Sequence, residues 1–264
     1  MRCAGARVSA LGEVVSMRNG AWQRILLGGG RGNLLSLDLV RELGQHLHAI
    51  ESQRGIKWVT FEGTGGEFSY GARIQEHLPE PMRTVLPETH RIIKRVLGLP
   101  MPTAALVEGR CLGGGFELAL ACDDIIATDA ATFGLPEIRL AAFAPAAAAI
   151  LPLRVGASRA TRAIVTGHIH DANYWHEAGL VSMVAPQSDL LEAAAAYFDT
   201  HFAKSSAVAL SHAVTAARLT LRAQAEPALD RAERDYLAGL LDTQDATEGI
   251  TAWLEKRSPN WKNE

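Results

Sequence analysis

Two glutamates occupy settings in which a carboxylate needs a physical reason to be present. Glu117 lies in GRCLGGGFELALACD, residues 109–123, after three glycines and inside an otherwise apolar run. Glu137 follows a proline in FGLPEI, twenty residues further along the chain. Burying an unpaired carboxylate is unfavourable and raises its pKa. Two such groups can divide general-acid and general-base work, although a helix cap and a surface acid are the purely structural alternatives.

The glycines before Glu117 suggest a second chemical element. TAALVEG, RCLGGG and FELALAC read in order as a strand, a glycine loop and a helix, so N–H groups are free at the helix N-terminus, where the dipole favours negative charge. In FSYGARIQEH the Gly71-Ala72 step leads from a loop into a predicted helix, so the Ala72 N–H is also expected to point at a ligand. The N–H groups of Ala72 and Gly114 therefore predict a two-donor oxyanion hole.

The elements that must position these groups alternate between strands and helices. Asn19-Gly20 predicts a β-hairpin with a two-residue type I′ turn, and Ser36 can cap the helix that follows. Alternating strands and helices favour βαβ units and a mostly parallel sheet, hence an α/β fold. Beyond residue 190 the apolar spacing is helical throughout. The sequence therefore predicts a core with the active site at residues 1–190 and a helical C-terminal region at 191–264. Strands are predicted at 57–63, 103–109 and 124–134, and helices at 35–52, 89–99 and 113–123.

Composition excludes several classes of protein. The 264 residues are 48% hydrophobic and 21% charged with a net charge of −3, so no basic excess indicates nucleic acid or an anionic membrane surface. No apolar run of about 18 residues predicts a membrane span, and the N-terminus has no sustained apolar core of a signal peptide. Cys3, Cys111 and Cys122 form neither a metal pattern nor a disulfide framework, which fits a reducing, cytoplasmic location.

Other chemical motifs are weak or missing. The pairs His46/His48 and His168/His170 have no acid or cysteine set at ligand spacing, so solvated histidines are favoured over a metal site. The glycine loop lacks the Gly-x-Gly-x-x-Gly spacing of a dinucleotide fold, and no Gly-x-Ser-x-Gly elbow predicts a serine hydrolase.

The three chemical segments together resemble the crotonase, or enoyl-CoA hydratase, superfamily. Its first oxyanion loop is similar to FSYGARIQEH, its glycine-rich segment to GRCLGGGFELALACD, and its second-glutamate segment to FGLPE. The resemblance implies that Ala72 and Gly114 supply the oxyanion hole and that Glu117 and Glu137 are catalytic. Further similarity, covering most of the chain, lies at Asn33-Leu34, VTGHIHDANYWHEAGLVSMV and DATEGITAWLEKRSPNW.

The family's properties are expectations for this chain. The resemblance implies an α/β fold built as a crotonase-like spiral of ββα units, with a helical C-terminal trimerisation region and a homotrimer or homohexamer. It implies hydration of an acyl-CoA in which coenzyme A is part of the substrate, with no metal or redox cofactor. Which glutamate is the acid and which the base stays open. The substrate-binding residues implied are Tyr70, Arg73, Phe143 and Pro145.

A narrower resemblance concerns the substrate. GARIQEHLPE and PEIRLAAFAPAAAAILP are similar to the cyclohexa-1,5-diene-1-carbonyl-CoA hydratases of aromatic degradation. Alanines 146–149 stand where ordinary hydratases carry glycines, and their methyl groups are expected to narrow the acyl pocket. Arg73 replaces a common aspartate, and GGGRG replaces the usual Arg-Pro before Asn33.

Three alternatives remain beside the cyclic diene. An acyclic enoyl-CoA hydratase of fatty-acid oxidation would differ only in the shape of its pocket. Another crotonase reaction, isomerisation or thioester hydrolysis, would use the same oxyanion hole, although two retained glutamates favour hydration. A non-catalytic acyl-CoA-binding oligomer would bind the thioester without turnover.

Overall fold

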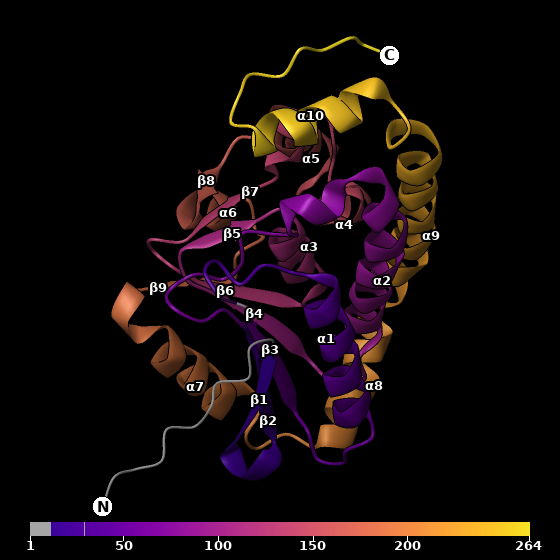
Figure 1. Cartoon of the computed structure of the whole chain (residues 1–264). Coiled ribbons are helices and arrows are strands. Elements are labelled where there is room, and N and C mark those ends of the chain that lie inside the picture. The colour runs from indigo at the N-terminus through magenta and orange to yellow at the C-terminus, as the bar shows by residue number, and fades with distance from the viewer. Residues whose placement is uncertain (1–11, 29) are drawn as a thin grey trace, which may run out of the picture.

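A six-stranded sheet is the centre of the molecule (Figure 1). The computed structural model describes residues 12–28 and 30–264, so the predicted N-terminal start and Cys3 lie outside the described residues. The strand order is β1-β2-β3-β4-β6-β9, and a small second sheet has the order β5-β7-β8. The strands are β1 (Gly12–Met17), β2 (Trp22–Leu27), β3 (Trp58–Glu62), β4 (Thr103–Val107), β5 (Arg110–Leu112), β6 (Asp124–Thr128), β7 (Thr132–Gly134), β8 (His170–Asp171) and β9 (Met183–Ala185).

Helices pack on both faces of the large sheet. The helices are α1 (Leu37–Glu51), α2 (Pro79–Gly98), α3 (Gly114–Ala121), α4 (Pro145–Val155), α5 (Ala157–Thr166), α6 (Ala172–Glu177), α7 (Leu190–His201), α8 (Ala207–Ala217), α9 (Leu219–Asp235) and α10 (Gln244–Leu254). Short turns of helix occur at η2 (Ile74–His77) and η3 (Pro136–Leu140), and η5 (Tyr236–Leu240) is a π-helical turn. The mixed α/β class and the helical region after β9 were both predicted and are confirmed.

The N-terminal hairpin confirms the predicted turn. β1 and β2 pair antiparallel with Met17 opposite Trp22. Asn19 has φ 56° and ψ 38°, Gly20 has φ 88°, and the Ala21 N–H donates to the Arg18 carbonyl at 3.2 Å. These left-handed angles at two central residues are those of a type I′ turn, which Asn-Gly favours.

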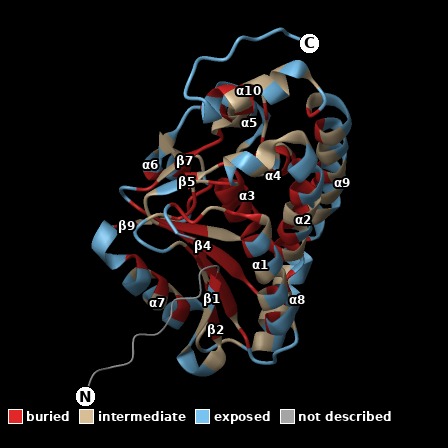
Figure 2. Ribbon diagram, in the orientation of Figure 1, coloured by how far each residue is buried: buried red, intermediate tan, exposed pale blue. Residues whose placement is uncertain are grey.

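Strand alternation divides the apolar side chains between two cores. On one face, Trp22 and Trp58 pack against Phe198 of α7. On the other face, Val59 and Phe61 pack with the buried faces of α1 and α2. The remaining ladders of the six-stranded sheet are parallel, as predicted: β2–β3, β3–β4, β4–β6 and β6–β9. Figure 2 shows the buried residues gathered in this sheet and in α3.

Two predicted elements have different boundaries. The segment 124–134 is not one strand, because a turn that closes with Ala131 N–H donating to the Thr128 carbonyl separates β6 from β7, and β7 joins the second sheet. α2 starts at Pro79, ten residues before the predicted start at residue 89, and it continues through Pro87. Proline suits the first turn of a helix, whose N–H groups have no intrahelical partner.

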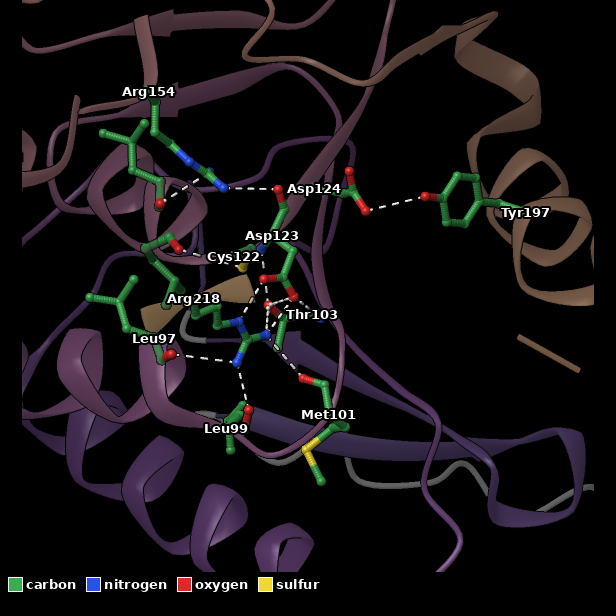
Figure 3. Close-up of polar contacts among 12 residues, drawn as sticks. Leu97, Leu99, Met101, Thr103, Cys122, Asp123, Asp124, Arg154, Tyr197 and Arg218 are labelled. Carbon is green, nitrogen blue, oxygen red and sulfur yellow. Dashed lines mark hydrogen bonds and ion pairs between the residues drawn. The ribbon is translucent and has the colours of Figure 1, made fainter. Parts of the chain in front are cut away.

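A buried arginine ties the C-terminal helices to the sheet (Figure 3). Arg218 is 5% exposed, and its guanidinium donates to Asp123 and to the carbonyls of Leu99 and Met101. Asp123 in turn accepts the Thr103 N–H at 2.7 Å, at the start of β4. A buried ion pair is stable only when its remaining donors and acceptors are also satisfied, and these contacts satisfy both partners. The first residue of β4, the strand that precedes β5 and the glycine loop, is therefore fixed by this ion pair.

The division of the chain at residue 190 stays a prediction. α4 from the first part packs against α9 from the second. None of the helices described is both long and apolar enough to cross a bilayer.

Candidate active site

Glu117 lies on a helix that is buried on every side. All eight residues of α3 are buried, and Glu117 itself is 5% exposed. Its Oε1 accepts the N–H groups of Ala146 at 2.7 Å and Ala147 at 3.0 Å, in the first turn of α4. The carboxylate is therefore held by the N-terminus of another helix and makes no capping bond to its own.

The N–H groups of Ala72 and Gly114 converge beside Glu117. A Cβ on Gly114 would lie 3.6 Å from the Ala72 nitrogen and 3.9 Å from Glu117 Oε2, and a Cβ on Gly71 would lie 3.3 Å from the Gly114 nitrogen. Neither N–H donates to a backbone acceptor within residues 12–28 and 30–264. Two free donors thus face one small space, which is the geometry of an oxyanion hole.

The predicted reason for the orientation of Ala72 is wrong, because no helix begins there. Ala72 forms a parallel bridge with Leu35, and η2 starts only at Ile74. The Leu35 N–H donates to the Gly71 carbonyl at 3.0 Å. The bridge to the segment before α1 therefore fixes the direction of the Ala72 N–H.

Glu137 reaches the same space from the second sheet. β5 and β7 pair in parallel with Leu112 opposite Gly134, and the Gly113 N–H donates to the Gly134 carbonyl at 2.9 Å. Because the glycine loop follows β5 and the Glu137 turn follows β7, this pairing brings the two together. A Cβ on Gly113 would lie 2.4 Å from Glu137 Oε1 and would displace that carboxyl group, and the φ of 51° at this position favours glycine.

The two carboxyl groups have different electrostatic surroundings. Burial, and then the charge of Glu117, raises the pKa of Glu137 to about 8, and its Oε2 has no hydrogen-bond partner within the described residues. Burial also raises the pKa of Glu117, but the charge of His90 and the N–H groups of Ala147 and Ala146 oppose that rise. The arrangement favours a protonated Glu137 beside an ionised Glu117.

One narrow cavity connects these groups. Its volume is about 40 Å³, enough for one or two water molecules, so an acyl group requires wall side chains to move. Apolar side chains of α2 form much of the wall, at Met82, Val85 and Leu86. Six of the predicted site residues line the cavity: Ala72, Gly114, Glu117, Glu137, Phe143 and Pro145.

Two predicted substrate-binding residues lie outside the lining of this cavity. The Tyr70 hydroxyl donates to Glu67 at 2.8 Å, and the Arg110 guanidinium lies 4.9 Å from the centre of the Tyr70 ring. Arg73 is exposed. A part in binding the substrate stays a prediction for both.

The expectation that alanine methyl groups narrow the pocket is wrong. Ala146 and Ala147 are fully buried in the main core and do not line the cavity, and Ala149 is 5% exposed in the same core. Because the first two supply the N–H groups that hold Glu117, this stretch acts through its backbone. Phe143, Ala144 and Pro145, just before it, form the wall instead.

Four polar residues at or near the cavity were not predicted. His77, Thr89 and Tyr236 line it. His90 is 1% exposed, its charge acts on Glu117, and its Nδ1 lies 2.6 Å from Glu233 Oε2. His77 lies in the quoted EHLP segment, but nothing in its spacing distinguishes it. Tyr236 and Glu233 come from the C-terminal helices, so only packing brings them here.

Comparison with known proteins adds independent findings. A sequence model described as Enoyl-CoA hydratase/isomerase matches residues 30–264. A cyclohexa-1,5-dienecarbonyl-CoA hydratase of Thauera aromatica is 37% identical over 93% of this chain and 95% of its own. A 2,3-dehydroadipyl-CoA hydratase of Escherichia coli is 34% identical over 87% and 90%. The solved structure of an enoyl-CoA hydratase from Bacillus anthracis has a TM-score of 0.76 at 32% identity and covers 96% of this chain and 99% of its own. That of an enoyl-CoA hydratase from Mycobacterium avium subsp. paratuberculosis has a TM-score of 0.83 at 26% identity and covers 97% of this chain and 99% of its own.

Proposed function

We propose, because the chain belongs to the enoyl-CoA hydratase/isomerase family, that it adds water to the conjugated double bond of an enoyl-CoA thioester. The observation that carries this proposal is the convergence of two free N–H groups and two carboxyl groups on one buried cavity. Binding alone would not require a second, protonated carboxyl group. Coenzyme A is part of the substrate, and the proposed reaction needs no metal or redox step.

The oxyanion hole binds the thioester carbonyl in this scheme. The carbonyl oxygen accepts hydrogen bonds from the N–H groups of Ala72 and Gly114. As water attacks the β-carbon, electrons of the double bond move toward that oxygen, and the donors stabilise the negative charge. One such donor is worth about 3–4 kcal/mol in the transition state.

The two glutamates divide the proton transfers. Glu117, which accepts two helix N–H groups, is the base that takes a proton from water as its oxygen bonds to the β-carbon. Glu137, whose pKa is about 8, is the acid that gives its proton to the α-carbon. Proton exchange with solvent then restores both groups.

This assignment predicts how activity depends on pH. Raising the pH through about 8 removes the proton of Glu137, so kcat/KM is expected to fall about tenfold per unit above that value. Acidification that protonates Glu117 should lower kcat/KM as well. A pH profile of kcat/KM checks both limbs, and a rate that stays constant up to pH 10 would contradict a protonated Glu137.

For the acyl group we propose a cyclic diene. The Thauera aromatica relative supports it, and so does the aromatic wall at Phe143, whose ring lies 5.3 Å from that of Tyr236. Shape alone supplies about 1–3 kcal/mol of selectivity, so some activity on linear substrates is expected.

A substrate panel tests this choice and its alternatives. Cyclohexa-1,5-diene-1-carbonyl-CoA is expected to have a kcat/KM about 10-fold or more above that of crotonyl-CoA. Faster hydration of crotonyl-CoA would favour the acyclic hydratase. Release of free coenzyme A, or a shifted double bond without added water, would indicate the hydrolase or the isomerase. Binding without any turnover would indicate the non-catalytic oligomer.

We also propose that the chain assembles as a homotrimer or homohexamer. Exposed apolar side chains occur on η3, α5 and α10, where Ile138 is 40%, Val165 57% and Trp253 53% exposed. Such residues become covered in an assembly. Light scattering at micromolar concentration should report three or six times 28.3 kDa, and a monomer would contradict the proposal.

A further inference from the structure

One side chain of the C-terminal helices lines the cavity that also holds the proposed acid and base. Tyr236 is 4% exposed and lines the cavity together with Glu117 and Glu137. It is the first residue of the π-helical turn η5, directly after α9. Turns of this kind are rare and occur frequently at functional sites.

The sequence of α9 explains why Tyr236 points inward. Ala225 and Leu229 are fully buried, and Glu233 and Tyr236 follow them at spacings of four and three residues. Positions spaced in this way share one face of a helix. The face that packs into the core therefore ends at Tyr236.

Polar contacts between α2 and α9 hold this tyrosine beside the cavity wall. Glu233 Oε2 lies 2.6 Å from His90 Nδ1, and Lys94 pairs with Asp230. Beyond η5, Asp242 pairs with Arg83 at 2.5 Å. α2 also carries Met82, Val85 and Leu86 of the wall. The pairs join both sides of Tyr236 to the helix that lines the site.

None of the hydrogen bonds among the described residues involves the hydroxyl group of Tyr236, and no hydrogen bond acts on its pKa. Burial, followed by the charges of Glu137 and Glu117, raises the pKa of Tyr236. The phenol therefore keeps its proton throughout the working pH range, in the electric field of both carboxyl groups. The Phe143 ring, tilted 55° against it, restrains the aromatic plane.

We propose that Tyr236 is a catalytic residue whose hydroxyl oxygen holds the attacking water against Glu117; the inference rests on the hydration proposed above. Water has two O–H groups to place. One donates to Glu117, which takes that proton, and the other donates to the Tyr236 oxygen. Glu137 is then free to keep its own proton for the α-carbon. The phenol gains and loses no proton, so the atoms balance as in the reaction already described.

The test is Tyr236→Phe, which removes the hydroxyl and keeps the ring against Phe143. We expect kcat to fall about 10-fold or more, KM to stay within about twofold, and the melting temperature to be unchanged. The matched control is Tyr197→Phe. The Tyr197 hydroxyl donates to Asp124 at 3.2 Å, and Tyr197 does not line the cavity, so this variant should leave kcat unchanged. Wild-type kcat in Tyr236→Phe would overturn the inference, as would a rise in KM with kcat preserved.

Two further readouts separate this inference from the proposed function. If the wild-type protein hydrates no enoyl-CoA, both fail together; if it does and Tyr236→Phe is fully active, only the role of Tyr236 fails. A structure with 3-hydroxybutyryl-CoA, a hydration product, should place the Tyr236 oxygen within about 3.2 Å of the added hydroxyl oxygen. A separation beyond about 3.5 Å would overturn the contact.

Discussion

Replacing Glu117 or Glu137 by glutamine is expected to lower kcat for enoyl-CoA hydration by about 100-fold or more, because each variant loses one of the two proton transfers. Glutamine keeps the size of the side chain. In Glu117→Gln its amide oxygen can still accept the Ala146 and Ala147 N–H groups, so the fold should survive. Steady-state kinetics with crotonyl-CoA and the cyclic diene measure the loss.

Stability distinguishes the two variants from simple misfolding. In the folded chain the pKa of Glu137 is about 8, against an ordinary value of 4.5, so its stabilising contribution is complete below pH 4.5 and is lost as the pH rises to about 8. The melting temperature of Glu137→Gln minus that of the wild type should therefore be larger at pH 8 than at pH 5. The control is Glu226→Gln, which removes only a partly exposed pair with Arg222. Near-wild-type kcat in either active-site variant would refute its assignment.

Replacing Gly114 by proline is expected to lower kcat by about 100- to 1,000-fold, because it deletes one of the two oxyanion donors. Gly114 is the first residue of α3, after Gly113 as N-cap. Proline is well tolerated at that helical position, so the loss should be one of activity more than of folding. Circular dichroism and a melting curve confirm the folded state before kinetics are compared.

Gly114→Ala is the matched control for the missing donor. It retains the N–H, and its Cβ would meet Leu35, Ala72 and Glu117 at 3.5, 3.6 and 3.9 Å, which are ordinary contact distances. The alanine variant should therefore lose clearly less activity than the proline variant. Equal losses would show that space at this position matters and that the N–H does not.

The local part of this site could be read from the chain. The order of strand, glycines and helix around Glu117 was visible because apolar runs and glycines report local backbone structure. The Asn19-Gly20 turn and the Ser36 cap, whose oxygen accepts the Leu39 N–H, follow from the same local chemistry. Motif order and spacing also marked Ala72, Gly114, Glu117 and Glu137, which the structure places around one cavity.

What the sequence determined by itself was thus which residues are the two proposed N–H donors and the two proposed catalytic carboxyl groups, and the strand, loop and helix around Gly114 and Glu117. Only the tertiary structure decided the surroundings of each carboxyl group: the N-terminus of α4 holds Glu117, while the β5–β7 pairing buries Glu137 beside Gly113. It also brought Tyr236 to the cavity from the C-terminal helices. Desolvation and contacts between distant segments set a pKa and the direction of a side chain, and no local pattern of residue types encodes either of them.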